Sequence, residues 1–256
     1  MRKIAIWVLT LVLVTVLNVP SAFAVTDDGF IDAIAADSGY TFGENAEFEV
    51  RFVTENARSN EGVVEFVVSE ELEDGTNVMT FLKPYSEDGN ELHQMTIQEY
   101  NAKINSRAPV NEFNIIKGDV NVYLRAYYTS TTRNGWGGRF FRPVTAKMKC
   151  TYSTGTVTAA SVGLGLRGEL YNLDVSSTVP INDDYEYISM KSLGTMTSGV
   201  EKSATVTSLP SGQYVYVGSG STTGGSVFVV LWEFTRNNVV YQDMGHEVVY
   251  SQASAG

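Results

Sequence analysis

The chain has 256 residues, with 18 lysines and arginines against 29 aspartates and glutamates, and a formal net charge of -11. This acidic balance argues against nucleic acids and anionic membrane surfaces as partners, because both reward clustered basic side chains. A single cysteine excludes an internal disulfide, so a hydrophobic core has to hold the fold, and the 43% hydrophobic content is enough for one large or two small domains.

The N-terminal residues have the pattern of a cleavable signal peptide. Two basic residues precede an apolar run from Ile4 to Leu17, and Ala22-Phe23-Ala24 fits a small-x-small cleavage site. The run is too short to span a membrane comfortably as a helix, although an uncleaved anchor is the alternative. We therefore expect residues 1–24 to be a signal peptide and the remaining chain to be secreted and extracellular, without stable membrane insertion.

Apolar and polar residues alternate along most of the remaining chain. Phe48, Val50 and Phe52 alternate with charged residues, and a second series runs from Val144 to Tyr152. This period of two, with its β-branched and aromatic residues, indicates half-buried strands. Turn-forming residues separate the strands, which predicts an all-β, antiparallel fold. The helix candidates are short: residues 28–36 and 97–105.

Two passages suggest diverged copies of one hairpin. Residues 118–141 and 212–234 each read as glycine, strand, a loop of small polar residues, and strand. Composition bias in the loops is the alternative explanation, because a repeat needs self-similarity at a fixed period. We place a domain boundary near Pro143. The prediction is an N-terminal β-sandwich over 25–143, after a short N-terminal segment, and a C-terminal β-sandwich over 144–256; a single larger sandwich is the alternative.

The segment Leu209-Pro210-Ser211-Gly212-Gln213-Tyr214 has the Leu-x-x-Gly-x-Tyr form of a tyrosine corner. In such a corner the tyrosine hydroxyl bonds back to the backbone and fixes the crossover between two strands. This pattern resembles the immunoglobulin-like and fibronectin-like modules of bacterial exported proteins. The resemblance implies antiparallel Greek-key sandwiches, here two tandem immunoglobulin-like domains.

Catalytic residues have two candidate arrangements. Cys150, with His93 upstream and Arg167 downstream, has the residue order of the sortase transpeptidases, but its local sequence does not match that family. Cys150 also lies on the apolar side of its strand, which favours a buried thiol. Glu65 and Glu233 each interrupt an apolar strand and could form a glycosidase carboxylate pair, although solvent-facing positions explain them as well.

The sequence gives little support to a metal or a cofactor. The histidines have no paired ligand spacing for zinc, and neither acidic turn matches an EF-hand loop. No phosphate-cradling glycine motif is present. We therefore predict that the protein uses no cofactor and no metal.

The remaining site candidate is an aromatic and basic patch on one strand and the loop after it. Its residues are Tyr123, Arg125, Tyr127, Arg133, Trp136 and Arg139. Exposed tryptophan, tyrosine and arginine are favoured at binding surfaces, and loops at the ends of sandwiches often carry recognition. A tryptophan folded back onto its own sheet is the alternative. We expect a non-catalytic binding or structural module with an extracellular glycan or protein as its partner; a secreted hydrolase or transpeptidase is the alternative.

Overall fold

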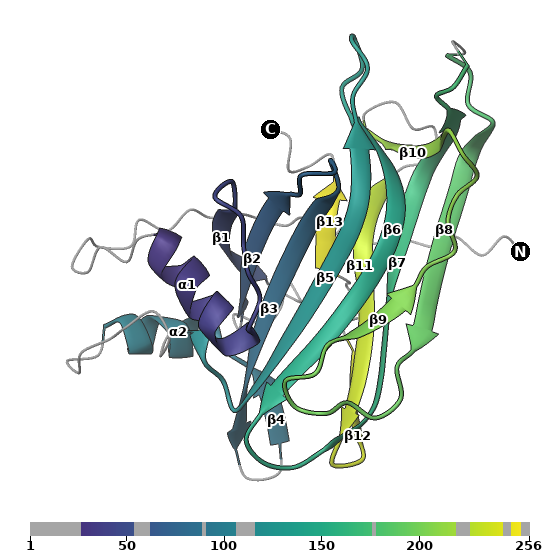
Figure 1. Cartoon of the computed structure of the whole chain (residues 1–256). Coiled ribbons are helices and arrows are strands. Elements are labelled where there is room, and N and C mark those ends of the chain that lie inside the picture. The colour runs from purple at the N-terminus through teal and green to yellow at the C-terminus, as the bar shows by residue number, and fades with distance from the viewer. Residues whose placement is uncertain are drawn as a thin grey trace, which may run out of the picture.

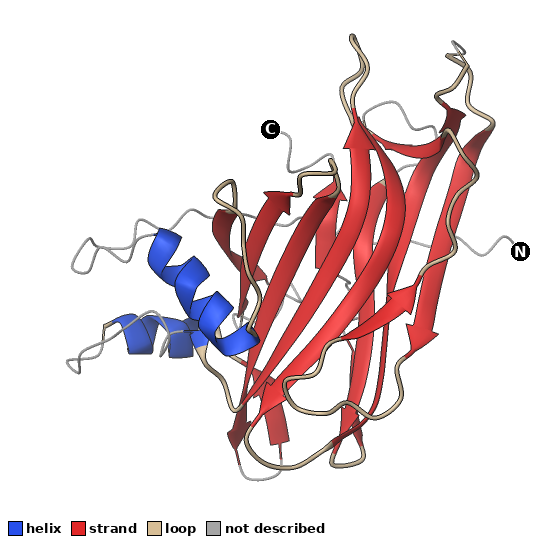
Figure 2. Cartoon of the chain, viewed as in Figure 1, coloured by secondary structure: helices blue, strands red, loops and turns tan. Residues whose placement is uncertain are grey.

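The structure is a computed structural model that describes residues 27–53, 62–88, 91–105, 116–175, 178–218, 226–242 and 247–251. The predicted signal peptide and its cleavage site lie outside these residues. The described residues form two helices and one 13-stranded antiparallel sheet (Figure 2). The prediction of an all-β, antiparallel fold is confirmed at this level. No helix in the described part of the chain is long and apolar enough to cross a membrane.

The first half of the sheet is a layer of long strands, which we name the first layer. Its strand order is β1-β2-β3-β5-β6. The short strand β4 pairs with the last residues of β3. The strands are β1 (Glu47–Val53), β2 (Val63–Glu71), β3 (Asn77–Asp88), β4 (Glu91–Gln94), β5 (Val120–Thr131) and β6 (Arg139–Tyr152).

The second half of the sheet, which we name the second layer, is built around β7. β8 lies on one side of β7 and β11 on the other, and β12 and β13 both pair with β11. The strands are β7 (Val157–Asn172), β8 (Asn182–Ser192), β11 (Val227–Arg236), β12 (Val239–Gln242) and β13 (Glu247–Ser251).

Two short strands line the side of β6 that faces away from β5. β9 (Lys202–Thr205) pairs with the middle of β6, and β10 (Gln213–Val217) pairs with the start of β6 and with the end of β7. β10 therefore forms the corner at which the first layer continues into the second. Figure 1 shows β10 beside the loop that joins β5 and β6.

The main hydrophobic core lies between the two layers. Ring contacts cross it from β3 to β11, where the Tyr85 and Phe234 centroids are 5.6 Å apart, and from β5 to β11, where Tyr128 and Phe228 are 5.1 Å apart. Side chains of alternate residues point into this core, as the period-two pattern requires. The predicted domain boundary near Pro143 falls inside β6, and the core contains residues from both sides of it.

Helices α1 (Asp27–Ser38) and α2 (Ile97–Ile104) cover the outer face of the first layer, the face turned away from the second layer (Figure 1). Both predicted helices are confirmed. Phe30 of α1 stacks on Phe48 of β1 at 4.6 Å, and Tyr100 of α2 meets Phe66 of β2 at 5.9 Å. A second hydrophobic cluster thus fills the space between the helices and strands β1, β2, β3 and β5.

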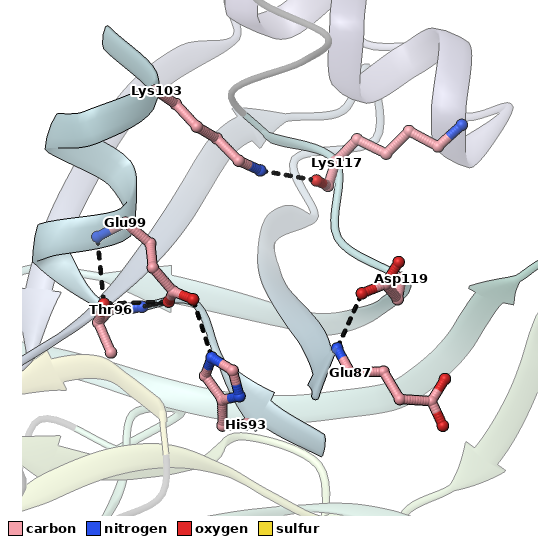
Figure 3. A network of polar contacts seen from close by, with 7 residues as sticks. All are labelled: Glu87, His93, Thr96, Glu99, Lys103, Lys117 and Asp119. Carbon is pink, nitrogen blue, oxygen red and sulfur yellow. Dashed lines mark hydrogen bonds and ion pairs between the residues drawn. The ribbon is translucent and has the colours of Figure 1, made fainter. Parts of the chain in front are cut away.

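A capping box starts α2 and ties it to neighbouring segments (Figure 3). The Thr96 backbone N–H donates to the Glu99 carboxylate at 2.6 Å, and the Glu99 N–H donates to the Thr96 hydroxyl at 3.2 Å. Partial burial acts to raise the pKa of Glu99, but hydrogen bonds from Thr96 and His93 outweigh it and lower the pKa. At the other end of α2, the Lys103 ammonium donates to the Lys117 carbonyl at 3.1 Å. The capping box satisfies N–H groups at the start of the helix that would otherwise lack partners, and the Lys103 contact ties its end to the segment before β5.

Candidate functional site

The six residues predicted as one patch form two groups, and Arg139 lies on the face of the sheet opposite to the other strand residues among them. Tyr123, Arg125 and Tyr127 lie along β5, and we name them the covered group. Arg133, Trp136 and Arg139 lie in the β5–β6 loop and at the start of β6, and we name them the corner group. A β-bulge in the β5–β6 pairing after Tyr127 separates the two groups.

Tyr123 is buried beneath the end of α1. Its hydroxyl donates to the Asp37 carboxylate at 2.5 Å. The same carboxylate oxygen accepts from the Asn121 amide at 2.8 Å and from the Thr151 hydroxyl at 3.0 Å. Burial, followed by the nearby Asp37 charge, raises the pKa of Tyr123 well above its ordinary value. Tyr123 therefore anchors α1 to β5 and presents no surface to a ligand.

Arg125 is only 8% exposed and is enclosed by polar and aromatic side chains. Its guanidinium donates to the Glu70 carboxylate and to the Thr80 hydroxyl, each at 3.1 Å. The guanidinium carbon lies 4.4 Å from the Tyr40 ring centre and 5.2 Å from that of Tyr127. Cation–π contacts and a buried ion pair occupy this side chain, so its role here is structural.

Tyr127 is half-buried at the margin of the same network. The Lys147 ammonium lies 4.7 Å from the centre of its ring and 3.0 Å from the Glu201 carboxylate. Burial and then the Glu201 charge raise the pKa of Tyr40, whose ring stacks on Arg125. The segment after α1 thus closes over the covered group.

The corner group has a different environment. Trp136 packs onto rings from β6, β7 and β10: its centroid lies 5.3 Å from Phe140, 5.2 Å from Tyr171 and 5.0 Å from Tyr216. The contacts with Tyr171 and Tyr216 are edge-to-face, at 90° and 83°. The tryptophan does fold back onto its own sheet, yet it stays half-exposed. No helix contributes to this cluster in the described part of the chain.

Glycines allow the corner group to sit this close to β10. A Cβ at Gly138 would lie 2.3 Å from the Val217 carbonyl oxygen and 2.5 Å from the Cα of Gly218. Gly135 has a φ of 83°, which a residue with a side chain rarely adopts. The turn is closed by the Trp136 N–H, which donates to the Arg133 carbonyl at 3.1 Å. The glycines around Trp136 therefore shape the turn and permit backbone contact with β10.

Charged groups border the aromatic cluster. The Arg133 guanidinium lies 5.7 Å from the Phe140 ring centre, whereas the exposed Arg139 pairs with Val217 and lies on the other face of the sheet. The Tyr171 hydroxyl donates to the Glu169 carboxylate at 2.6 Å. Burial and then this hydrogen bond raise the pKa of Tyr171. The corner thus combines a half-buried indole with one arginine and one carboxylate at the margin of the aromatic cluster.

Phe140, Tyr171 and Tyr216 are the members of the corner that the sequence interpretation missed. The Gln213-Tyr214-Val215-Tyr216-Val217 run carries the signal that could have found one of them. Its valines face the core, so its tyrosines must face outward. Nothing in the sequence places this run beside Trp136, because β10 lies far from the β5–β6 loop along the chain.

The candidate carboxylate pair of a glycosidase is not assembled. Glu65 lies in the core at 1% exposure, with one carboxylate oxygen 3.8 Å from the Lys83 ammonium. Trp232 and Phe234 face the same core, so Glu233 between them points to the outer face of the second layer, where it accepts from the Ser161 hydroxyl at 3.1 Å. The second layer therefore separates the two carboxylates.

The transpeptidase-like residues are also apart. Cys150 is fully buried in the core, as predicted, and burial raises its pKa to about 12. His93 is exposed on β4 and lies 2.9 Å from the Glu99 carboxylate. Arg167 lies on β7, where it faces Asp184 of β8 at 3.8 Å. A protonated, enclosed thiol without the histidine beside it is poorly suited to nucleophilic attack.

The predicted tyrosine corner is only partly reproduced. Leu209 is buried, and Gly212 has a φ of 73° and accepts from the Leu173 N–H at 2.7 Å. Tyr214, however, lies half-buried at the margin of the aromatic cluster, and no hydrogen bond reaches its hydroxyl from the described residues. The turn is present, but within the described part of the chain no hydrogen bond of the tyrosine hydroxyl fixes it.

The described residues contain no cluster of three or more histidine, cysteine, aspartate or glutamate side chains that could hold a metal ion. Comparison of the chain with protein-family models, with curated proteins and with solved structures found no match in any of the three. The candidate site with a defined geometry is the corner group and the rings beneath it.

Proposed function

We propose that this chain is a secreted, non-catalytic β-sandwich protein whose corner group binds an extracellular glycan. The observation that supports it is the half-buried Trp136, held by three aromatic rings beside Arg133. The covered group, by comparison, has its aromatic and basic side chains already engaged with Asp37 and Glu70.

The chemistry of a sugar matches this corner. One face of a pyranose ring carries C–H groups, which pack against the electron-rich face of an aromatic ring. Its hydroxyls accept hydrogen bonds from arginine and donate to carboxylates. Because the rings beneath Trp136 hold the indole in place, little side-chain entropy is lost on binding. A rigid aromatic platform with polar groups at its margin is therefore suited to a glycan.

For the domain plan, we favour the single larger sandwich over two tandem immunoglobulin-like domains. β6 runs without a break through Pro143, although a β-bulge marks that point in its pairing with β5. Val122 and Phe228, which come from opposite sides of the predicted boundary, belong to one core. A boundary between independent domains would be crossed by few contacts.

Tryptophan fluorescence and affinity electrophoresis test the proposed site. Without residues 1–24, Trp136 and Trp232 are the tryptophans that remain, and Trp232 is only 4% exposed. We expect soluble mannan, xylan, cello-oligosaccharides or chito-oligosaccharides to perturb the fluorescence of the protein, and Trp136→Ala to weaken binding by about tenfold or more. Trp232→Phe is the matched control and should keep both the binding and the signal.

Two results would contradict the proposal. One is unchanged binding by Trp136→Ala at constant fold, measured by circular dichroism. The other is the absence of binding to every glycan of the panel, together with saturable binding of an extracellular protein, which would move the ligand class from glycan to protein.

A further inference from the structure

β8 is an edge strand of the sheet. Its 11 residues pair with β7 and with no other described strand. Figure 1 shows it at the rim of the second layer. An edge strand presents unpaired backbone groups and is a template for pairing with another chain, unless its sequence prevents this.

The direction of the backbone groups on β8 follows from its register. The Leu193 N–H donates to the Ala160 carbonyl at 2.8 Å, directly after the Ser192–Ser161 pair. Since backbone groups alternate in direction along a strand, the odd-numbered residues of β8 bond to β7. The N–H and C=O groups of the even-numbered residues from Glu186 to Met190 therefore point toward the open edge.

Side chains on one face of β8 are buried and hydrogen-bonded, and apolar side chains on the other face are exposed. Tyr187 and Ser189 point inward and are tied to Thr207: the Tyr187 hydroxyl donates to its carbonyl at 2.6 Å, and the Ser189 hydroxyl accepts from its N–H at 3.2 Å. On the outer face Ile188 is 64% exposed and Met190 is 38% exposed. The strand is thus fixed in place while its edge and two apolar side chains remain accessible.

Most of β8 lacks the features that block edge pairing. It contains no proline, and its pairing with β7 is regular from Tyr185 to Ser192; the bulge in that pairing lies before this stretch, at Asp183 and Asp184. The opposite edge of the sheet, β1, differs because charged residues alternate along it: Glu47, Glu49 and Arg51. On β8 the charges are segregated instead, with Asp183, Asp184 and Glu186 at the start and Lys191 at the end.

We propose that two copies of this chain pair through β8, antiparallel and around a two-fold axis at Tyr187. This arrangement brings the acidic start of one β8, at Asp183 and Asp184, beside Lys191 of the partner subunit, and symmetry forms the contact twice. It also sets Glu186 opposite Ile188 of the partner subunit. The N–H and C=O groups that point toward the open edge of each strand can then form hydrogen bonds with each other. The two sheets then continue across the interface.

Charge selects this register over its neighbour. An axis at Ile188 would also pair backbone groups that point toward the open edge, but it would set Tyr185 opposite Lys191 of the partner subunit and move the acidic start of β8 away from that lysine. Opposite charges directly across an antiparallel pair are favourable, and like charges in the same positions are unfavourable. The axis at Tyr187 is therefore the one that the sequence of β8 favours.

Sedimentation velocity of the chain without residues 1–24, from micromolar to millimolar concentration, tests the dimer. The parent protein should show a concentration-dependent monomer–dimer equilibrium. Asp183→Lys or Lys191→Asp alone brings like charges together twice, and each should weaken the dimer by about tenfold or more. The double variant restores the pair with reversed signs and should recover most of the affinity. A parent protein that is monomeric throughout, or a double variant no tighter than the singles, would overturn the proposal.

Matched controls distinguish pairing through β8 from non-specific hydrophobic association, and they define the register of the pairing. Ile188→Lys should abolish the dimer, whereas Val240→Lys, at a 55% exposed position on β12, should not. Mixing Glu186→Cys protein with Ile188→Cys protein should give a disulfide-linked heterodimer, because residues directly opposite in a ladder have the Cα separation that a disulfide needs. Faster linkage of Ile188→Cys with itself would place the axis at Ile188 and contradict the proposed register.

Discussion

Arg125 and Arg139 lie on neighbouring strands of the same layer, one on β5 and the other at the start of β6, and their environments are opposite. Arg125 is 8% exposed and bound to Glu70, whereas Arg139 is exposed. The tyrosine and the tryptophan of the two groups differ in the same way: Tyr123 is buried beneath α1, and Trp136 is half-exposed. Residue type and strand position alone therefore do not distinguish a binding side chain from a structural one.

The difference comes from the segment that follows α1. Asp37 receives the Tyr123 hydroxyl, Tyr40 stacks on Arg125, and the Gly43 N–H donates to Glu70 at 2.9 Å. These contacts close over the covered group and stop short of the β6–β10–β7 corner. Covering a polar side chain with charged partners gives it a structural role, and leaving it open keeps it available to a ligand.

The largest effect is expected from Arg125→Met. This change leaves the Glu70 carboxylate buried without its cation, which costs about 3–5 kcal/mol of unfolding free energy. Arg139→Met makes the same substitution at an exposed position and should change stability by less than about 0.5 kcal/mol. Denaturant unfolding, compared through midpoints at constant slope, measures both. Equal losses in the two variants would show that the two groups do not differ in the way described.

A smaller effect is expected from Tyr123→Phe. It removes one donor to Asp37 but leaves those of Asn121 and Thr151, so the loss should be about 1.5–3 kcal/mol, the usual range for a hydrogen bond to a charged group. Tyr127→Phe, on the same strand face, is the matched control and should cost less than about 1 kcal/mol.

The same pair of variants has a pH signature. The pKa of Tyr123 is raised on folding, so the stability from its neutral hydroxyl is fully present below the ordinary value of 10.0 and is lost as the pH rises above it. Between about pH 10 and pH 11 the parent protein should therefore lose stability more steeply than Tyr123→Phe. Parallel pH profiles would mean that this hydroxyl is not the buried group described here.

The smallest effect is expected from Tyr214→Phe. Its hydroxyl has no hydrogen bond to the described residues, so the variant should unfold within about 0.5 kcal/mol of the parent. A loss of about 1–3 kcal/mol would instead show that the hydroxyl satisfies a buried backbone group, as in a tyrosine corner. Chemical denaturation of the variant beside the parent decides between these outcomes.

The sequence by itself determined the local features of this protein. The alternation of apolar and polar residues predicted the strands, and the short polar segments predicted the turns. The position of Cys150 on the apolar side of its strand predicted its burial. The two helices were predicted near their observed bounds. These features depend on neighbours within a few residues, because side-chain direction and backbone preference repeat with the period of the element.

The tertiary structure alone decided which candidate residues stay open. Tyr123 and Asp37 are separated by 86 residues along the chain, and β10 reaches the corner only because the sheet turns from β6 to β7. The free edge of β8 likewise follows from strand order and not from its own sequence. Contacts of this kind join segments whose local patterns are independent of each other, so no local pattern carries them. For that reason the sequence predicted one patch, and the folded chain contains a covered group and a corner group.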